Sequence, residues 1–329
     1  MKPTIALVTG GYSGEAVISY KSAVTIETNL DTEKFVIFKI DITPKGWFHH
    51  LKDGTKISVD KNDFSLTIDG KRILFDAVLI GIHGTPGEDG KLQGYFDLLK
   101  LPYTTCDAAT SALTFNKRYT VAVAAFAGIH VAKSLHLFKR HPVEPEKIAS
   151  EMQLPVFVKP NNGGSSIGMS KVTRPEDLGP ALEKAFKEDE QVLIEEFITG
   201  REFTIGVFRA KGEIITLPFT EIKTKKEFFD FEAKYTAGFT EEITPAVVEE
   251  FIAAKVRETA RKVYSIFNCR GVVRIDFIYN ELVGEPFMLE INTVPGQTDA
   301  SLVPQQVKAM GWTLREFYNS LIEEALAQK

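Results

Sequence analysis

Two alternating segments near the carboxyl terminus constrain the fold more than any other feature of the sequence. Residues 272–278 read VVRIDFI and residues 287–292 read FMLEIN, with a turn around residues 280–285. Side chains of a strand point to opposite faces with a period of two. Arg274 and Asp276 therefore share one face of the first strand, and Glu290 and Asn292 share one face of the second. The pattern predicts a hairpin.

The polar face of this hairpin predicts a metal site. It combines a cation with three oxygen ligands, Asp276, Glu290 and Asn292. Hard oxygen donors suit Mg²⁺, which takes one or two carboxylates and fills its other positions with water and substrate phosphate. The alternative is a solvated outer face of a sheet edge. The apolar residues at the intervening positions, and the TVPG segment that follows, favour the metal site over a plain surface.

A loop rich in Gly and Ser, PNNGGSSIG at 160–168, follows a predicted strand that ends in Lys159. Small residues let backbone N–H groups approach a phosphate closely, and the lysine adds a point charge. The loop is not a Walker A motif, because Met169 stands where that motif needs a lysine. A flexible hairpin turn remains the alternative, but the carboxylate hairpin on the same chain favours nucleotide phosphate.

Two further loops follow predicted strands in the first third of the chain. GGYSGE, at 10–15, separates the first strand from a helix, where an anion can bind. Taken by itself, the pattern favours an ordinary role for Glu15, as an acid that compensates the helix dipole. HGTPGEDG, at 83–90, follows the third strand, at the sheet edge where ligands collect. A tight structural turn is the competing interpretation there.

The order of predicted elements indicates an α/β protein of three parts, with boundaries at 1–107, 108–190 and 191–329. In the first part we expect a parallel sheet, with a polar hairpin excursion at 52–71 that lies outside the core. In the third part we expect a loop at 223–242, of a length that is often functional. The predicted strands are 5–9, 35–40, 77–82, 156–159, 169–172, 192–195, 203–208 and 214–218. The predicted helices are 15–30, 91–100, 112–127, 176–186, one starting at Thr244–Pro245, and one marked by Leu314, Phe317, Leu321 and Ala325.

Composition indicates which partners the protein binds and in which cellular compartment it works. The net charge of −5 argues against a general nucleic-acid binder, which normally carries surplus Lys and Arg. No stretch reaches the roughly 18 apolar residues of a membrane span. Cys106 and Cys269 lie far apart, without a metal or disulfide spacing. We therefore expect a cytoplasmic protein that binds neither nucleic acid nor membrane.

Six segments, taken in order and spacing, resemble the D-alanine–D-alanine ligases of bacterial cell-wall synthesis. They are GGYSGE, HGTPGEDG, KPNNGGSSIGMSKV, EAKY, VVRIDF and LEINTVPGQTDASLVP. The phosphate loop and the RID and EIN strands are common to ATP-grasp enzymes, whereas the first two segments and the last indicate this family in particular. The resemblance implies an ATP-grasp fold preceded by a Rossmann-like, pre-ATP-grasp domain.

The resemblance also implies an activity. The carboxylate of one D-alanine would attack the γ-phosphate of ATP, and the amine of a second D-alanine would displace phosphate from the acyl phosphate. The dipeptide D-alanyl-D-alanine serves peptidoglycan synthesis, and so cell wall and cell shape. Two Mg²⁺ ions, for which Mn²⁺ could substitute, would bridge the phosphates. A homodimer is expected on the same ground.

Site residues follow from the match to the family's motifs. Contacts to ATP are implied for Lys117, Lys159, Glu195, Phe197, Ile198 and Glu202, and two metal ions for Asp276, Glu290 and Asn292. Glu15 would pair with the first ammonium, oriented through Ser165 and Tyr235. Arg274 and the Gly296 N–H would stabilise the oxyanion. Substrate contacts are implied for His83, Lys234, Ser301 and the Leu302 N–H. The loop that carries Lys234 and Tyr235 would close over the site and exclude water.

Two other functions stay open at this point. One is a D-alanine–D-lactate or other D-amino-acid ligase. Tyr235 argues against the lactate enzyme, since the resemblance links an aromatic hydroxyl here to amine acceptors. The other is a nucleotide-binding module without turnover, which the filled catalytic positions disfavour. Val17 and Ala300 depart from the family's commoner acidic residue and His, which bears on the details of substrate selection.

Overall fold

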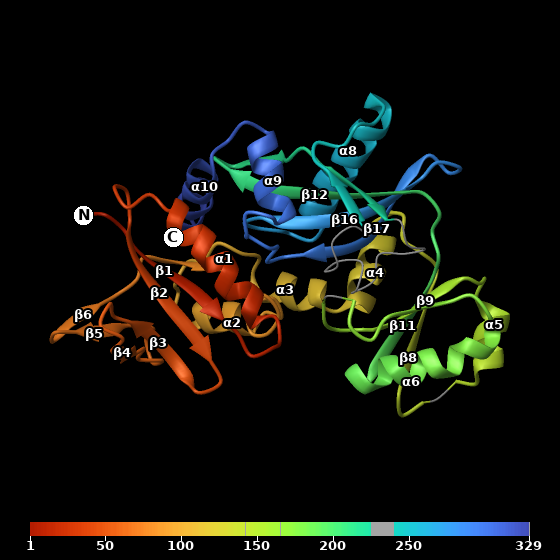
Figure 1. Cartoon of the computed structure of the whole chain (residues 1–329), viewed down its shortest axis with the longest axis horizontal. Coiled ribbons are helices and arrows are strands. Elements are labelled where there is room, and N and C mark those ends of the chain that lie inside the picture. The colour runs from red at the N-terminus through yellow and green to blue at the C-terminus, as the bar shows by residue number, and fades with distance from the viewer. Residues whose placement is uncertain (142, 165, 225–239, 329) are drawn as a thin grey trace.

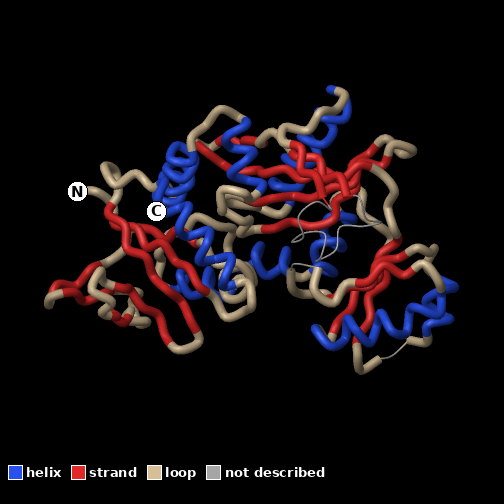
Figure 2. Tube along the Cα trace, viewed as in Figure 1, coloured by secondary structure: helices blue, strands red, loops and turns tan. Residues whose placement is uncertain are grey.

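The computed structural model describes residues 1–141, 143–164, 166–224 and 240–328 (Figure 1). Strands gather into three main sheets, seen as three groups in Figure 2, and helices lie against each of them. The fold is α/β, as the order of predicted elements indicated.

The amino-terminal sheet has the order β4-β3-β2-β1-β7. Its centre is parallel, with β1 (Thr4–Gly10) between β2 (Val36–Thr43) and β7 (Ala77–Ile80), and all three strands were predicted. Antiparallel strands β3 (Gly46–His50) and β4 (Lys56–Ser58) extend one side, so the sheet is mixed. Helices α1 (Ala16–Asn29) and α2 (Lys91–Leu98) confirm the two expected helices.

The segment expected to be an excursion outside the core contributes to it. Val59, Phe64 and Leu66 are buried in one cluster with the β1 and β2 side chains. A small hairpin of β5 (Leu66–Ile68) and β6 (Lys71–Ile73) follows. The prediction was wrong because polar residues dominate this stretch, while its few apolar side chains all turn inward.

Two helices replace the single helix predicted at 112–127. They are α3 (Ala108–Phe115) and α4 (Lys117–Phe126), and they meet at Asn116. The Asn116 side chain accepts a hydrogen bond from Tyr119 N, so it caps the start of α4. This break sets Lys117 at the first position of a helix.

The second sheet has the order β10-β9-β11-β8 and is antiparallel. Its strands are β8 (Ser134–Phe138), β9 (Val156–Pro160), β10 (Ser170–Val172) and β11 (Gln191–Glu196). α5 (Pro145–Glu151), the 3₁₀ turn η1 (Pro175–Asp177) and α6 (Leu178–Glu188) accompany it (Figure 1). We expected β11 to open the third part, but it pairs with β8 and β9; β8 was not predicted.

The third sheet has the order β15-β14-β12-β16-β17, with β13 also paired to β12. The strands are β12 (Arg201–Ala210), β13 (Glu213–Thr216), β14 (Thr220–Thr224), β15 (Thr240–Ile243), β16 (Val273–Asn280) and β17 (Glu285–Asn292). The predicted carboxylate hairpin is therefore confirmed as β16–β17. Both ends of the expected loop at 223–242 are strands, and residues 225–239 lie outside the described residues.

The described residues of this part also form the helices α8 (Glu250–Ile266), α9 (Leu302–Ala309) and α10 (Leu314–Leu326). α8 starts at Glu250 rather than at Thr244–Pro245, because the Thr244 hydroxyl is hydrogen-bonded to Thr220 and its segment stays beside β14. α10 was predicted, and its Phe317 and Tyr318 pack in one cluster with Ile5 and Leu7 of β1. Helix α10, at the carboxyl terminus, therefore joins the first and third sheets through this shared cluster.

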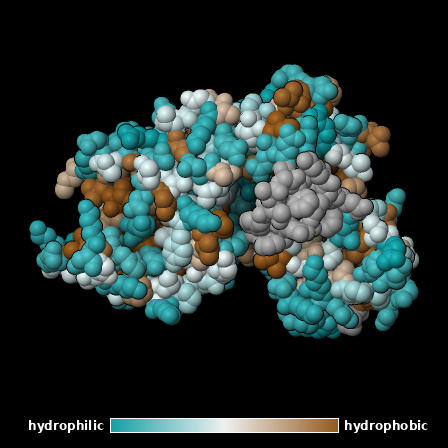
Figure 3. All heavy atoms as spheres, in the orientation of Figure 1, coloured by the Kyte–Doolittle hydropathy of each residue, from teal (hydrophilic) through white to brown (hydrophobic). Residues whose placement is uncertain are grey.

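The face drawn in Figure 3 is mostly hydrophilic, with separate hydrophobic clusters. None of the helices in the described ranges is long and apolar enough to span a membrane.

Candidate active site

A cavity of about 960 Å³ is lined by residues of the second and third sheets, of α1, and of the loops at 83–90 and 160–168. Every predicted site residue within the described ranges lines it. These are Glu15, His83, Lys117, Lys159, Glu195, Phe197, Ile198, Glu202, Arg274, Asp276, Glu290, Asn292, Gly296, Ser301 and Leu302. The predicted Ser165, Lys234 and Tyr235 lie outside the described residues. Segments more than 250 residues apart in sequence therefore contribute to one cavity.

The hairpin sets the spacing of the charged wall. Asp276 lies opposite Glu290, and Arg274 lies opposite Asn292, in the pairing of β16 with β17. Val273, Ile275 and Phe277 between them are fully buried. Burial of one face thus holds all four polar side chains on the other, as the alternation predicted.

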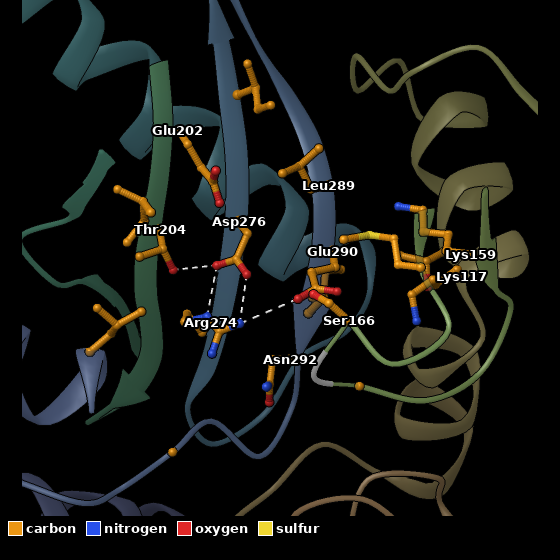
Figure 4. Close-up of a pocket in the computed structure, with 18 of the residues that line it drawn as sticks. Lys117, Lys159, Ser166, Glu202, Thr204, Arg274, Asp276, Leu289, Glu290 and Asn292 are labelled. Carbon is orange, nitrogen blue, oxygen red and sulfur yellow. Dashed lines mark hydrogen bonds and ion pairs between the residues drawn. The ribbon is translucent and has the colours of Figure 1, made fainter. Parts of the chain in front are cut away.

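Arg274 is the centre of this wall (Figure 4). Its Nε and Nη2 donate to the two carboxylate oxygens of Asp276 at 2.9 and 2.7 Å, and its Nη2 lies 3.6 Å from Glu290 Oε1. Burial alone would lower the pKa of Arg274, but the charges of Asp276 and Glu290 raise it above the ordinary value. The guanidinium is therefore a permanent cation between two carboxylates.

Thr204 completes the surroundings of Asp276. It lies opposite Asp276 in the pairing of β12 with β16, and its hydroxyl donates to Asp276 Oδ1 (Figure 4). Sequence reasoning missed Thr204. A Thr in an apolar strand has no local signal, because only the pairing of β12 with β16 brings it to the carboxylate.

The oxygen set on this wall fits a Mg²⁺ site. Asp276, Glu290 and Asn292 offer two carboxylates and an amide, on adjacent strands and facing one cavity. No group of three His, Cys, Asp or Glu side chains in the described ranges is placed to hold a metal ion. The donors are therefore too few for an all-protein cage. They suit an ion that keeps water and substrate phosphate among its ligands.

Two lysines project from the opposite wall (Figure 4). Lys159, near the end of β9, forms an ion pair with Glu195 of β11. Lys117, the first residue of α4, donates to the Gly163 carbonyl oxygen at 2.7 Å. Lys117 thereby links α4 to the Gly-rich loop, and both ammonium groups stand beside the loop that was predicted to hold phosphate.

An apolar recess continues from this wall. Phe197 and Phe157 lie with ring centroids 5.9 Å apart, and the Phe197 N–H donates to the Pro155 carbonyl oxygen at 3.0 Å. Met169 and Leu289 also line the cavity. We did not predict Phe157, Met169 or Leu289, since apolar strand residues look like core in a sequence. An apolar slot next to paired charges suits an apolar ring such as a nucleotide base.

His83 is held as a neutral imidazole. Its Nδ1 lies 2.8 Å from the Val294 carbonyl oxygen and its Nε2 lies 2.9 Å from Ser22 Oγ. A carbonyl only accepts, so Nδ1 carries the proton and Nε2 accepts from the serine. Burial, with the charge of Arg274, lowers the pKa of His83 to about 4, despite the hydrogen bond to Val294.

Glu15 stands at the start of α1 between two Gly loops. A Cβ on Gly164 would come within 2.9 Å of Glu15 Oε1, and one on Gly84 within 2.6 Å of Oε2. The carboxylate therefore packs directly against both backbones, which only residues without a side chain allow. The predicted loops 10–15, 83–90 and 160–168 thus meet at one carboxylate.

Glu88 is a second acid at this place, and sequence reasoning did not single it out from its loop. Its Oε2 accepts a hydrogen bond from Gly84 N at 2.6 Å. Burial, then the charge of Glu15, raises the pKa of Glu88 to about 8. The side chain is therefore a neutral acid at pH 7.

The segment after β17 forms the end wall. Ser301, the residue before α9, receives hydrogen bonds at its Oγ from the Thr298 N–H, at 3.1 Å, and shares one with the Thr298 hydroxyl, at 2.8 Å. A Cβ on Gly296 would come within 2.8 Å of Ser301 Oγ. Gly296, Ser301 and Leu302 are thus close together at one end of the cavity.

Comparison with known proteins gives the family. Residues 4–106 match the family model described as D-ala D-ala ligase N-terminus, and residues 116–323 match D-ala D-ala ligase C-terminus. D-alanine–D-alanine ligases from Flavobacterium johnsoniae and Phocaeicola vulgatus are 45% and 44% identical, each over 98% of this chain and 99% of the relative.

Solved structures agree. D-alanyl-alanine synthetase A from Vibrio cholerae superposes with a TM-score of 0.88 at 30% identity, covering 99% of both chains. VanG D-Ala:D-Ser ligase from Enterococcus faecalis superposes with a TM-score of 0.87 at 30% identity, covering 99% of this chain and 100% of that one. The D-alanine–D-alanine ligase from Bacillus anthracis complexed with ATP superposes with a TM-score of 0.78 at 27% identity, covering 99% of this chain and 98% of that one. On matches that span its whole length, and with the ATP-grasp fold and cavity described above, this chain belongs to the D-alanine–D-alanine ligase family of ATP-dependent ligases.

Proposed function

We propose that this protein joins two D-alanines to D-alanyl-D-alanine, with ATP as the source of energy, for peptidoglycan precursor synthesis. One observation carries the proposal. A single cavity combines the Arg274–Asp276–Glu290 wall, the Gly-rich loop with its two lysines, and the Glu15 carboxylate. These are the means to hold a triphosphate, a carboxylate that is to be activated, and an ammonium group.

The chemistry runs in two steps. A carboxylate oxygen of the first D-alanine attacks the γ-phosphorus, and ADP leaves. The amine of the second D-alanine, after it loses a proton, attacks the resulting acyl carbon, and inorganic phosphate leaves. Lys117 and Lys159 lie where they can bind the phosphates, and the slot of Phe157 and Phe197 can take adenine, beside Glu195, Ile198 and Glu202.

Asp276, Glu290 and Asn292 would hold two Mg²⁺ ions, or Mn²⁺. When bound, these ions neutralise the charge that develops on the transferring phosphoryl group. Arg274 acts beside them. Its position is fixed by Asp276, so it can face the oxyanion of the tetrahedral intermediate together with the Gly296 N–H, without rearranging during the reaction.

The two amino acids occupy opposite ends of the reacting centre. Glu15 pairs with the ammonium of the first D-alanine, supported by Ser165 and Tyr235, and His83 lies nearby as a neutral group. Ser301, the Leu302 N–H and Lys234 bind the carboxylate of the second. The proposal also includes a cytoplasmic location and assembly as a homodimer.

A different acceptor is the second candidate. The similarity to a structure described as a D-Ala:D-Ser ligase supports D-serine as an alternative acceptor within the same family. D-Lactate is a weaker candidate, given Tyr235. Chemistry at the donor and phosphate ends would be the same for each.

The test is a phosphate-release assay of the pure protein with ATP and Mg²⁺, against D-alanine, D-serine, D-lactate and L-alanine, with products identified by mass. We expect phosphate and D-alanyl-D-alanine with D-alanine alone, and none with L-alanine. Nucleotide binding without any acceptor-dependent ADP would instead indicate a non-catalytic module, and a dominant mixed dipeptide would indicate the second candidate. Omission of divalent cation should abolish phosphate release.

A further inference from the structure

Helix α1 and the residue before it both contribute to the cavity. Glu15, Ile18 and Lys21 all line the cavity. Residues three apart lie on one side of a helix, so these three side chains form one row. At about 1.5 Å per residue, the row is about 9 Å long at the backbone. Lys21 is therefore set well beyond Glu15, at the far end of the same wall.

The far end of this row adjoins the segment before α9. Ser22 Oγ accepts a hydrogen bond from Gln297 N at 3.1 Å, and the Tyr318 hydroxyl donates to Gln297 Oε1 at 3.2 Å. These contacts hold residue 297 against Ser22, the residue that follows Lys21 in α1. Thr298, Ser301 and Lys21 line the same cavity. The turn of α1 that carries Lys21 therefore lies against the segment that forms the end wall.

The charge of Lys21 is available to a ligand. The other Lys and Arg side chains that line the cavity in the described ranges have protein partners. They are Arg274 with Asp276, Arg201 with Glu221, Lys159 with Glu195, Lys223 with Glu221, and Lys117 with the Gly163 carbonyl. Lys21 is exposed, and within the part of the chain that the structure describes it has no hydrogen bond or ion pair. An uncompensated ammonium on a cavity wall attracts an anionic group.

A second source of positive potential lies at this end. α9 begins at Leu302, so its first N–H groups and the positive end of its dipole are directed to the end wall. Glu15, by contrast, makes the other end of the row negative. The row therefore runs from the acid proposed to hold the ammonium of the first D-alanine to a positive end near α9.

We propose that Lys21 binds the carboxylate of the acceptor amino acid and so selects acceptors that carry a free carboxylate. This inference rests on the proposed function and adds a specificity-determining residue to it. The amine of the acceptor must face the acyl carbon near Arg274. Its carboxylate then turns away from the hairpin, toward α9 and Lys21.

The experiment is a competition between two acceptors in one reaction. The protein, ATP and Mg²⁺ are incubated with D-alanine and D-alanine amide, and the ratio of D-alanyl-D-alanine to D-alanyl-D-alanine amide is measured by mass. The amide lacks the carboxylate, so it can act only as acceptor. Because both products draw on the same acyl phosphate, their ratio does not depend on how fast the enzyme works overall.

We expect the wild type to favour D-alanine strongly, and Lys21→Met to reduce that preference about tenfold, as the loss of a charge-assisted contact predicts. Lys21→Arg should retain most of the preference, because the charge remains. The control is Lys45→Met, at an exposed lysine in the turn between β2 and β3, which should keep the wild-type ratio.

A wild type that forms the dipeptide and a Lys21→Met variant with an unchanged ratio would overturn this inference alone. A wild type that forms neither product would overturn the proposed function, and the inference with it. An equal loss of preference in Lys45→Met would also count against Lys21, since the effect would then follow total charge rather than position.

Discussion

Arg274 and Asp276, two residues apart on β16, are joined by two parallel hydrogen bonds of 2.9 and 2.7 Å. The cation proposed for the oxyanion and a carboxylate proposed for the metal are therefore one unit. Neither side chain can move without disturbing the other. This coupling separates the effects that substitutions in the hairpin should have on turnover and on stability.

Replacement of Arg274 by Met should lower both turnover and stability. Asp276, with a side chain only 14% exposed, would keep its Thr204 contact but lose its counter-charge. Removing one partner of such a pair costs about 3 kcal/mol or more, and loss of an oxyanion donor costs about 10²–10³ in kcat. Arg274→Lys keeps the charge but cannot reproduce the two-bond geometry. Stability in urea and the rate of phosphate release should therefore both be highest in the wild type, lower in Arg274→Lys and lowest in Arg274→Met. Equal unfolding midpoints for all three proteins would contradict this.

Replacement of Glu290 by Gln should lower turnover alone. The Glu290 side chain is 42% exposed, and its link to Arg274 is long, at 3.6 Å. The folded protein therefore loses little, within about 1 kcal/mol for an exposed pair. The change removes a carboxylate from the proposed metal site, so we expect phosphate release to fall severely. Near-normal turnover in Glu290→Gln would refute the metal proposal, whereas a matched thermal midpoint shows that the fold persists.

His83 should make stability depend on pH on the acid side. Its folded pKa, about 4, lies below the ordinary value of 6.5. Between these pH values the unfolded chain binds a proton that the folded chain does not. Stability is therefore fully present above about pH 6.5 and is lost as pH falls, by about 3 kcal/mol in total.

His83→Asn removes this titration. Its unfolding free energy should be less sensitive to pH between 6.5 and 4 than that of the wild type, even though the variant is less stable at pH 7. The measurement is urea unfolding at several pH values, with exposed His141 replaced by Asn as control. Parallel curves for the wild type and His83→Asn would exclude a depressed pKa.

The sequence predicts the chemistry of this site better than its surroundings. The alternation in β16 and β17 is local, so it indicated which of Arg274, Asp276, Glu290 and Asn292 share a face before any pairing was known. The residues that were missed come from elsewhere in the fold. Thr204 meets Asp276 only through the pairing of β12 with β16, and Phe157 meets Phe197 only through the pairing of β9 with β11.

The errors in the fold have the same origin. Asn116 ends one helix and caps the next, but the sequence on both sides of it suits helix, so the two were predicted as one long helix. Phe64 and Leu66 reach the core from a polar segment, because the sheet they cover lies elsewhere in the chain. Local periodicity reports the face of an element, and only tertiary contact decides what that face covers.

Glu88 should make stability depend on pH in the opposite direction from His83. Burial and the nearby Glu15 raise its folded pKa to about 8, whereas the ordinary value is 4.5. Between these pH values the folded chain holds a proton that the unfolded chain has released. The contribution is therefore fully present below about pH 4.5 and is lost as pH rises through 8.

Glu88→Gln is neutral at every pH, so it should lack this loss. Relative to the wild type, its unfolding midpoint should rise as pH increases from 5 to 9. The exposed Glu213, changed to Gln, serves as control and should leave the wild-type dependence unchanged. A constant difference between wild type and Glu88→Gln across this range would mean that Glu88 is ionised in the folded protein, beside the charge of Glu15.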